Sequence, residues 1–198
     1  MEFFHITPLI QTIGLIGIFL FVFAESGLFF GFFLPGDSLL FTAGFLAAGG
    51  YFNIAFLLTG CFIAAVLGDS VGYWFGKKAG PKIFTREKSF FLNKHNIEKT
   101  MKFFEKHGEK TITLARFVPI VRTFAPIMAG VGQMNYTTFL TWNLLGAMLW
   151  VGIMTLGGYF LGNLVPSIDR FILPIIVFIV LASLVPVLLG FTRKAEEK

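Results

Sequence analysis

Five ionisable side chains lie in sequence that is otherwise strongly apolar. The three acids stand in the first half of the chain and the two bases in the second. An isolated charge at the centre of a lipid bilayer costs at least about 2.5–3.5 kcal/mol, so a charge inside a membrane is by default the sign of an ion or substrate path. The five residues are Glu25, Asp37, Asp69, Arg116 and Arg122.

Arg116 and Arg122 have the chemistry of a binding site for a lipid phosphate. A guanidinium group donates two parallel hydrogen bonds to a phosphate and stays charged at any relevant pH. The two arginines stand near helix-breaking prolines, and the N-terminus of a broken helix adds backbone N–H donors for an anion. The alternative is that they only neutralise Glu25 and Asp37 in structural ion pairs. We favour the binding site, because a buried ion pair is a costly way to gain stability.

Glu25 and Asp37 are candidates for proton coupling or gating. The arrival of a phosphate beside a carboxyl group changes its affinity for a proton, which links transport to proton movement. Each acid also has a simpler interpretation, since Glu25 would mark the outer interface and Asp37 would cap the helix that follows it. Asp69 and Asn143 lie inside apolar runs and are expected to be accessory to the site. A structural hydrogen-bonding role fits Asp69 equally well.

Enzyme chemistry is not expected from this sequence. All the histidines lie in hydrophilic segments, so no intramembrane histidine ligates a metal or acts as a base. The motifs of zinc proteases, serine hydrolases and P-loop proteins are absent from the sequence. We therefore expect no enzyme, no cofactor, no metal and no nucleic-acid partner. The histidines are His5, His95 and His107.

The composition indicates an integral membrane protein. Hydrophobic residues make up 56% of the 198 positions and charged residues only 14%. Mean hydropathy is +0.79, and a soluble domain carries about 25% charged residues. The single cysteine, Cys61, lies in an apolar run and gives no information on redox compartment. The start of the chain lacks a basic segment and a small-residue cleavage site, so we expect the first apolar run to be retained as a helix.

Six apolar stretches, separated by charged or turn-rich sequence, set the expected order of elements. Two of them contain helix breaks, expected at Pro35 and Gly36 in the first half and at Pro119 and Pro126 in the second. The other four come close to or exceed the roughly 20 residues of a spanning helix. The stretches are Leu9–Ala24, Ser26–Gly50, Ile54–Gly76, Thr111–Met134, Thr138–Gly162 and Phe171–Thr192.

Basic residues determine the expected orientation. The segment 77–110 carries ten Lys or Arg against four acids, and the tail after residue 192 is also basic. The positive-inside rule puts both in the cytoplasm, which requires that one stretch between them does not cross. Thr111–Met134, with its prolines and arginines, is expected to form a re-entrant hairpin. Ser26–Gly50 is expected to form a second hairpin from the opposite face, which leaves the N-terminus in the cytoplasm.

The expected fold is an all-α integral membrane protein built as an inverted repeat. Two opposed re-entrant helical hairpins are combined with about four spanning helices and a cytoplasmic amphipathic helix. A shift of the chain by 86 residues without gaps aligns Gly44 with Gly130 and Gly72 with Gly158. The single domain over 1–198 divides into a first repeat (9–76), an amphipathic segment (77–110), a second repeat (111–162) and a C-terminal spanning helix (171–192).

The segment 77–110 is expected to lie on the cytoplasmic surface as an amphipathic helix. Ile97, Met101 and Phe104 share one face, lysines lie elsewhere, and Gly108 is expected to end the helix. The basic residues either attract an anionic lipid surface, at about 1 kcal/mol per well-placed Lys or Arg, or reflect membrane topology alone.

Two groups of residues carry a family resemblance. The first is Glu25-Ser26-Gly27 with Phe33 to Leu40 and Ala43-Gly44. The second is Ala115 to Pro119 with Val121-Arg122-Thr123, Pro126, Ala129-Gly130 and Met134, continued by Phe139, Asn143, Gly146 and Trp150. Together they resemble the signatures of the DedA family, also called the SNARE-associated or VTT-domain family.

The resemblance implies a lipid flippase or scramblase. Bacterial members are linked to recycling of undecaprenyl phosphate and to the proton motive force, and others to movement of phosphatidylethanolamine. It also implies that Glu25, Asp37, Arg116 and Arg122 are the functional charges. With it, the expected function is transport of undecaprenyl phosphate across the bacterial cytoplasmic membrane for reuse in cell-wall synthesis, coupled to protons. The protein is expected to be multi-pass with both termini cytoplasmic.

Two alternatives stay open at this point. A phosphatidylethanolamine or general phospholipid flippase would use the same arginines, with a carboxylate for the amine. A proton-coupled exporter of small molecules or ions would use the acids for transport and the arginines as counter-ions. The sequence also leaves open the direction, the coupling ion and the oligomeric state, a homo-oligomer included.

Overall fold

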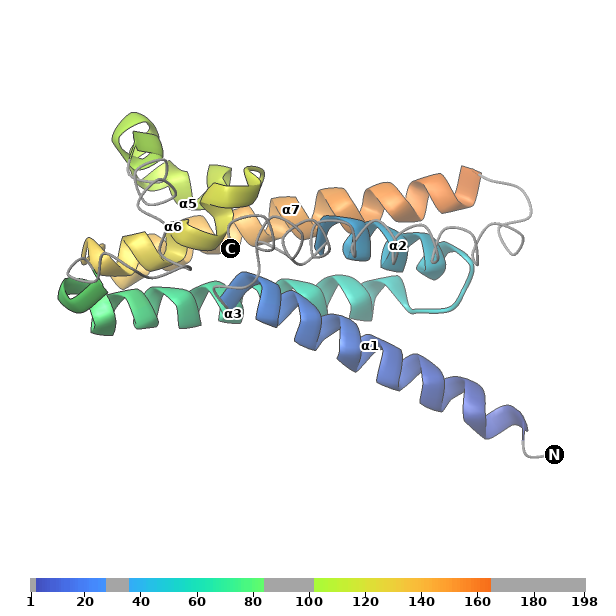
Figure 1. Ribbon diagram of the computed structural model, residues 1–198. Coiled ribbons are helices and arrows are strands. Elements are labelled where there is room, and N and C mark those ends of the chain that lie inside the picture. Colours follow the sequence, from blue (N-terminus) through green and yellow to red (C-terminus); the bar gives the residue numbers. More distant parts are fainter. Residues whose placement is uncertain (1–2, 28–35, 84–101, 165–198) are drawn as a thin grey trace, which may run out of the picture.

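The computed structural model describes residues 3–27, 36–83 and 102–164, and every regular element in these ranges is helical (Figure 1). The prediction of an all-α fold is therefore confirmed for the described part of the chain. The predicted C-terminal span over 171–192, Pro35 and most of the predicted amphipathic segment lie outside it. The helices are α1 (Phe3–Gly27), α2 (Gly36–Ala48), α3 (Ile54–Ile83), α5 (Thr111–Ala115), α6 (Pro119–Val131) and α7 (Tyr136–Leu164).

Among the described residues, α3 and α7 are the helices long and apolar enough to cross a membrane, over Ile54–Lys78 and Tyr136–Leu164. They run in opposite directions (Figure 1). An asparagine caps the start of each: Asn53 Oδ1 accepts from Ala55 N at 2.9 Å, and Asn135 Oδ1 accepts from Thr137 N at 2.8 Å. These side chains satisfy N–H groups that have no partner within the helix, so both long helices begin at the same kind of residue.

The short helices α2 and α6 contain 13 residues each. At 1.5 Å per residue this is about 20 Å, which falls short of the roughly 30 Å hydrocarbon core of a bilayer. α2 packs along α7 and α6 packs along α3. The two short helices begin near the middle of the long pair and run toward opposite ends (Figure 1). Their first turns therefore lie close together at the centre of the fold.

Glycines allow each short helix to touch the backbone of its long partner. A Cβ atom at Gly44 would collide with the carbonyl oxygen of Thr155, and one at Gly130 would collide with the carbonyl oxygen of Tyr73. The reciprocal contacts match as well, since Gly158 faces the backbone of Phe41 and Gly76 faces the backbone of Ile127. Such small-residue contacts are the usual means of close helix packing in membranes.

These matched contacts correct the alignment of the two halves. Gly44 and Gly130 correspond with a shift of 86 residues, as the ungapped comparison indicated. In the long helices, however, Gly76 corresponds to Gly158, which is a shift of 82. The difference of four residues is one helical turn. An ungapped comparison misses it because four residues of α2 follow Gly44 and only one residue of α6 follows Gly130, and the turns that come next hold five and four residues.

α1 contains the stretch Leu9–Ala24 that was predicted as the first spanning helix. It ends at Gly27, where a Cβ atom would meet the backbone of Gly68, halfway along α3. The far end of α1 lies on the same side as the turn between α2 and α3 (Figure 1). Arg122 and an amide N–H hold Glu25, near the end of α1, at the centre of the fold.

The chain breaks between α5 and α6, at residues 116–118, and Pro119 starts α6 where its missing N–H costs nothing. The break expected at Pro126 is absent. Pro126 is buried inside α6 and packs near Gly72 of α3. Neighbouring helices tolerate an internal proline in this way, so only the first of the two prolines interrupts the backbone.

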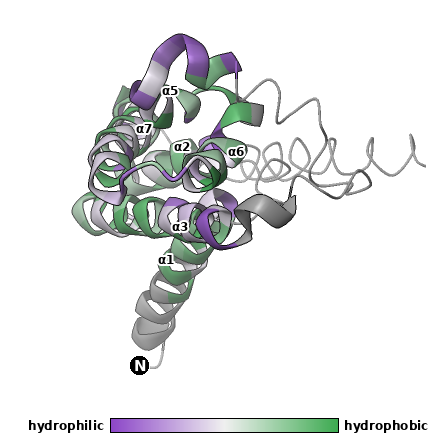
Figure 2. Ribbon diagram, turned by 90° about the vertical axis from the view of Figure 1, so that its left-hand side faces the viewer, coloured by the Kyte–Doolittle hydropathy of each residue, from purple (hydrophilic) through white to green (hydrophobic). Residues whose placement is uncertain are grey.

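Hydrophilic residues gather on the segment that precedes α5 (Figure 2). Residues 102–107 of this segment are helical, and Phe103 and Phe104 pack onto a buried cluster around Tyr73 and Ile112. Gly108 has φ +58 at the end of this helix, a conformation that favours glycine. The prediction that Gly108 ends the helix is therefore confirmed, whereas Ile97 and Met101 lie outside the described residues.

Candidate functional site

The first turns of α2 and α6 bring opposite charges together. Arg122, in the first turn of α6, donates from Nη1 to Asp37 Oδ1 at 2.8 Å and forms an ion pair with Glu25 Oε1. Asp37 is the second residue of α2, and Glu25 lies two residues before the end of α1. Three elements that are far apart in the sequence thus meet at one guanidinium group.

Glu25 also binds the start of α2. The backbone N–H of Gly36 donates to Glu25 Oε1 at 3.1 Å. A Cβ atom at Gly36 would overlap the Glu25 carboxylate, so only glycine permits this approach. A carboxylate that accepts from both a helix N-terminus and an arginine lies where an anion is most strongly favoured.

Arg116 forms a second, more deeply buried charge cluster. Its Nη2 donates to Asp69 Oδ2 at 2.6 Å and to Asn143 Oδ1 at 2.7 Å, and the carbonyl oxygen of Ala65 lies 3.5 Å away. The side chains of Arg116 and Asp69 are both 6% exposed. The sequence ranked Asp69 and Asn143 as accessory; the structure makes both direct partners of Arg116.

Trp150 contacts both arginine clusters. Its indole N–H donates to Asp37 Oδ1 at 2.6 Å. The guanidinium carbons of Arg122 and Arg116 lie 5.2 Å and 5.7 Å from the ring centroid, within the range of cation–π attraction. In the sequence this tryptophan stands out only as part of the family resemblance. Its position seven residues after Asn143, on the same face of α7, is the signal that could have placed it in the site.

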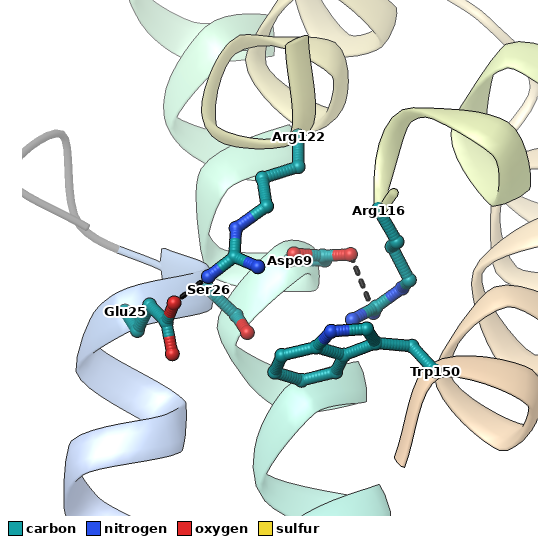
Figure 3. A pocket seen from close by; sticks show the side chains of 6 residues that line it. All are labelled: Glu25, Ser26, Asp69, Arg116, Arg122 and Trp150. Carbon is teal, nitrogen blue, oxygen red and sulfur yellow. Dashed lines mark hydrogen bonds and ion pairs between the residues drawn. The ribbon is translucent and has the colours of Figure 1, made fainter. Parts of the chain in front are cut away.

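A small cavity lies at the centre of the two clusters (Figure 3). Its volume is about 10 Å³, close to the minimum for one water molecule and far below the size of a phosphate. Glu25 Oε2 and Arg116 Nε are buried there without a hydrogen-bond partner among the described residues. The cavity is lined by Glu25, Ser26, Asp69, Arg116, Arg122 and Trp150.

The structure thus brings together all four charges expected to act in the site, and Asp69 with them. The charge balance is close to even, with three acids against two arginines. Exposure distinguishes the members, because the side chain of Asp37 is 48% exposed, that of Arg122 is 13% exposed and that of Glu25 is 1% exposed. Asp37 and Arg122 therefore form the more exposed side of the cluster.

The fold and the site define a class: helical membrane proteins in which two short helices meet head to head at a buried charge cluster. A model of the VTT domain matches residues 34–160, which include both short helices and most of the cluster. The chain belongs to this family of membrane proteins, the DedA family of the sequence resemblance.

Relatives cover most of the chain. Protein DedA of Escherichia coli is 44% identical over 178 residues, covering 89% of this chain and 81% of its own. The membrane protein ML0287 of Mycobacterium leprae is 45% identical over 169 residues, 85% of this chain and 75% of its own. The inner membrane protein YqjA of E. coli is 38% identical over 158 residues, 77% and 70% of the two chains. No solved structure matches the chain.

Proposed function

We propose that the protein moves the headgroup of a polyprenyl phosphate, undecaprenyl phosphate, across the bacterial cytoplasmic membrane for reuse in cell-wall synthesis. One observation carries the proposal: the Glu25 carboxylate accepts from both Arg122 and the N–H of Gly36. An arginine beside a helix N-terminus is a donor set suited to a phosphate. The Glu25 carboxylate occupies the position that the headgroup takes in this proposal.

Exchange of Glu25 for the headgroup supplies the proton coupling. The cavity of about 10 Å³ is too small for a phosphate, so the headgroup binds only when Glu25 leaves Arg122. A buried carboxylate without its cation is costly, and the group takes up a proton instead. Headgroup binding and proton uptake by Glu25 then occur together, and release of the headgroup reverses both. Asp37, the more exposed partner of Arg122, gates entry.

The two arginines act in sequence in this scheme. Arg122 is the more exposed of the two and meets the headgroup first. Arg116 is more deeply buried and also lies against the Trp150 ring, and its Nε has no partner among the described residues. It supports the bound phosphate from the inner side of the site. The lipid tail stays in the bilayer, so only the headgroup needs a polar path.

The proposed topology is an inverted repeat in which α1–α2 and α5–α6 are the two re-entrant hairpins. The short lengths of α2 and α6, the matched glycine contacts and the end of α1 beside Gly68 support it. In this arrangement α1 does not cross, so the N-terminus lies on the face opposite Lys77 and not in the cytoplasm. The basic segment 77–110 stays cytoplasmic, against an anionic lipid surface.

A phosphatidylethanolamine flippase is the second candidate. The exposed Asp37 carboxylate beside Arg122 suits a headgroup that carries an ammonium group next to a phosphate. The two candidates share the arginine site and differ in what Asp37 does. In the polyprenyl phosphate carrier Asp37 leaves the path, whereas in the flippase it binds the amine.

Transport by purified protein in liposomes tests the proposal. Headgroup translocation is measured for undecaprenyl phosphate and for phosphatidylethanolamine, with and without a pH gradient. We expect the polyprenyl phosphate to move, faster with the gradient, and Arg122→Ala to abolish movement. Lys110→Ala is the matched control, because Lys110 is an exposed cation outside the site. Unchanged lipid movement in Arg122→Ala would refute the phosphate site, and preferred movement of phosphatidylethanolamine would favour the second candidate.

Cysteine labelling tests the topology. Single cysteines at Tyr51 and Thr137, exposed residues beside the α2–α3 and α6–α7 turns, in a Cys61→Ser background, are treated with membrane-impermeant reagents from each side. We expect access from opposite sides, and a tag on the N-terminus on the side opposite Lys77. Access to both cysteines from the same side contradicts the inverted repeat.

A further inference from the structure

Trp150 contacts three of the five charged residues of the cluster. Its indole N–H donates to Asp37 at 2.6 Å, and its ring faces the guanidinium groups of Arg122 and Arg116. The residue is 2% exposed. Figure 3 shows the indole extending from α7 into the site beside Arg116. Trp150 therefore joins the Arg122 cluster to the Arg116 cluster.

The same oxygen of Asp37 accepts from Trp150 and from Arg122. The distances to Asp37 Oδ1 are 2.6 Å from the indole nitrogen and 2.8 Å from Arg122 Nη1. When Arg122 turns to another anion, the indole N–H remains as a donor for Asp37. The ring face likewise remains against the guanidinium group, 5.2 Å from the ring centroid. Each member of the Arg122–Asp37 pair thus keeps one partner when the pair breaks.

The face of α7 that carries Trp150 is in contact with the arginines. Asn143, Gly146 and Trp150 stand at helical spacing and are all buried. Asn143 accepts from Arg116, and a Cβ atom at Gly146 would lie 3.0 Å from Arg116 Cδ. The backbone of α7 is therefore close enough to fix the position of the indole relative to both guanidinium groups.

We propose, on the basis of the lipid phosphate transport proposed above, that Trp150 is a positioning residue that frees Arg122 for the phosphate. The indole N–H holds Asp37 away from Arg122 while the headgroup is bound. The ring face keeps the guanidinium group in place during the exchange by cation–π attraction. Trp150 acts through these two residues and needs no contact with the lipid.

Trp150→Phe separates the two contacts, because phenylalanine keeps an aromatic face and lacks the N–H donor. Without that donor Asp37 has no partner once Arg122 binds the headgroup, so the apparent KM for undecaprenyl phosphate rises, by at most about ten-fold because the indole bond to Asp37 is also present in the empty site. The kcat changes by less than about two-fold, since the site is intact once filled. Trp150→Leu loses both contacts, and both parameters deteriorate.

Trp142→Phe is the matched control. Trp142 lies on the same helix and is partly buried, and it packs on the cluster around Tyr73. We expect wild-type kinetics from this variant. A wild-type KM in Trp150→Phe, a loss of kcat at unchanged KM, or an equal effect of Trp142→Phe overturns the proposal.

Fluorescence provides a second readout on a protein that keeps Trp150. The chain has three tryptophans, so Trp74→Phe with Trp142→Phe leaves Trp150 as the single emitter. Vesicles with undecaprenyl phosphate, compared with phosphatidylcholine vesicles, are expected to shift its emission, and Asp37→Ala to remove that response. An emission shift without lipid transport refutes the proposed function and retains the role of Trp150 in binding. Transport without an emission shift overturns the role of Trp150 alone.

Discussion

The Arg116–Asp69 pair offers a quantitative test of the buried cluster. Both side chains are 6% exposed, and Arg116 Nη2 donates to Asp69 at 2.6 Å and to Asn143 at 2.7 Å. Removal of one member of a buried pair leaves an uncompensated charge and costs about 3–5 kcal/mol. We therefore expect Asp69→Ala to lower the free energy of unfolding by about that amount. Asn143→Ala removes only one hydrogen bond to a charged group, for a loss of about 1.5–3 kcal/mol.

Substitution of Arg116 shows whether the loss of unfolding free energy in Asp69→Ala arises from the unpaired charge of Arg116. Arg116→Met keeps an unbranched side chain and removes the charge. If Asp69 and Arg116 compensate each other, the double variant Asp69→Ala/Arg116→Met is more stable than Asp69→Ala alone, because no unpaired charge remains. Replacement of both members of a buried pair by apolar groups is often neutral or stabilising.

Reversible unfolding in mixed detergent measures these free energies on the full chain. Glu105→Ala is the control, because Glu105 is an exposed acid outside the cluster. We expect a change within about 0.5 kcal/mol for it. Two results would refute the reasoning: a loss below about 1 kcal/mol in Asp69→Ala, or additive losses in the double variant.

Further predictions concern the helix contacts and the start of α2. Gly44→Ala pushes α2 away from the backbone of α7 and is expected to cost about 1–3 kcal/mol in unfolding free energy. Gly152→Ala is the control, because a Cβ atom at Gly152 has no neighbour within 4 Å. This variant should be neutral or stabilising. Asn53→Ala removes the cap of α3 and is expected to cost about 1 kcal/mol, which thermal unfolding in detergent detects as a lower Tm. Gly36→Ala displaces Glu25 and is expected to abolish headgroup transport in liposomes while the helical content by circular dichroism stays unchanged; normal transport in this variant would contradict the Glu25 contact.

The sequence predicts the elements of this fold well, because they depend on local properties. Apolar length predicts α3 and α7, and the Pro-Gly and Pro-Ile starts predict where α2 and α6 begin. Pro126 shows the limit of such rules. Its effect depends on what lies beside it, and the glycine-lined side of α3 accommodates it within α6.

The pairing of charges could not be predicted in the same way. Spacing along the chain relates Arg116 to Arg122, but it does not reveal that Asp69 faces one and Asp37 the other. That assignment depends on each short helix packing against the long helix of the other half, a non-local contact with no sequence signal in one chain. Asp69 stands midway along α3, at the depth where a charge costs most, and this position was the available clue.

Each short helix packs against the long helix of the other half, and this has a consequence for synthesis of the protein. α2 contacts α7 at Gly44 and Thr155, so roughly 110 residues must be added before the contact forms. At about 5–20 residues per second this takes on the order of 5–20 s. Arg122 is made after about 80 of these residues and Trp150 after about 105, so Glu25 and Asp37 lack both partners for most of that interval. The nascent first half therefore has to wait at the insertion machinery or the membrane surface. The second half then supplies the missing helix contacts and the positive charges that the first half lacks.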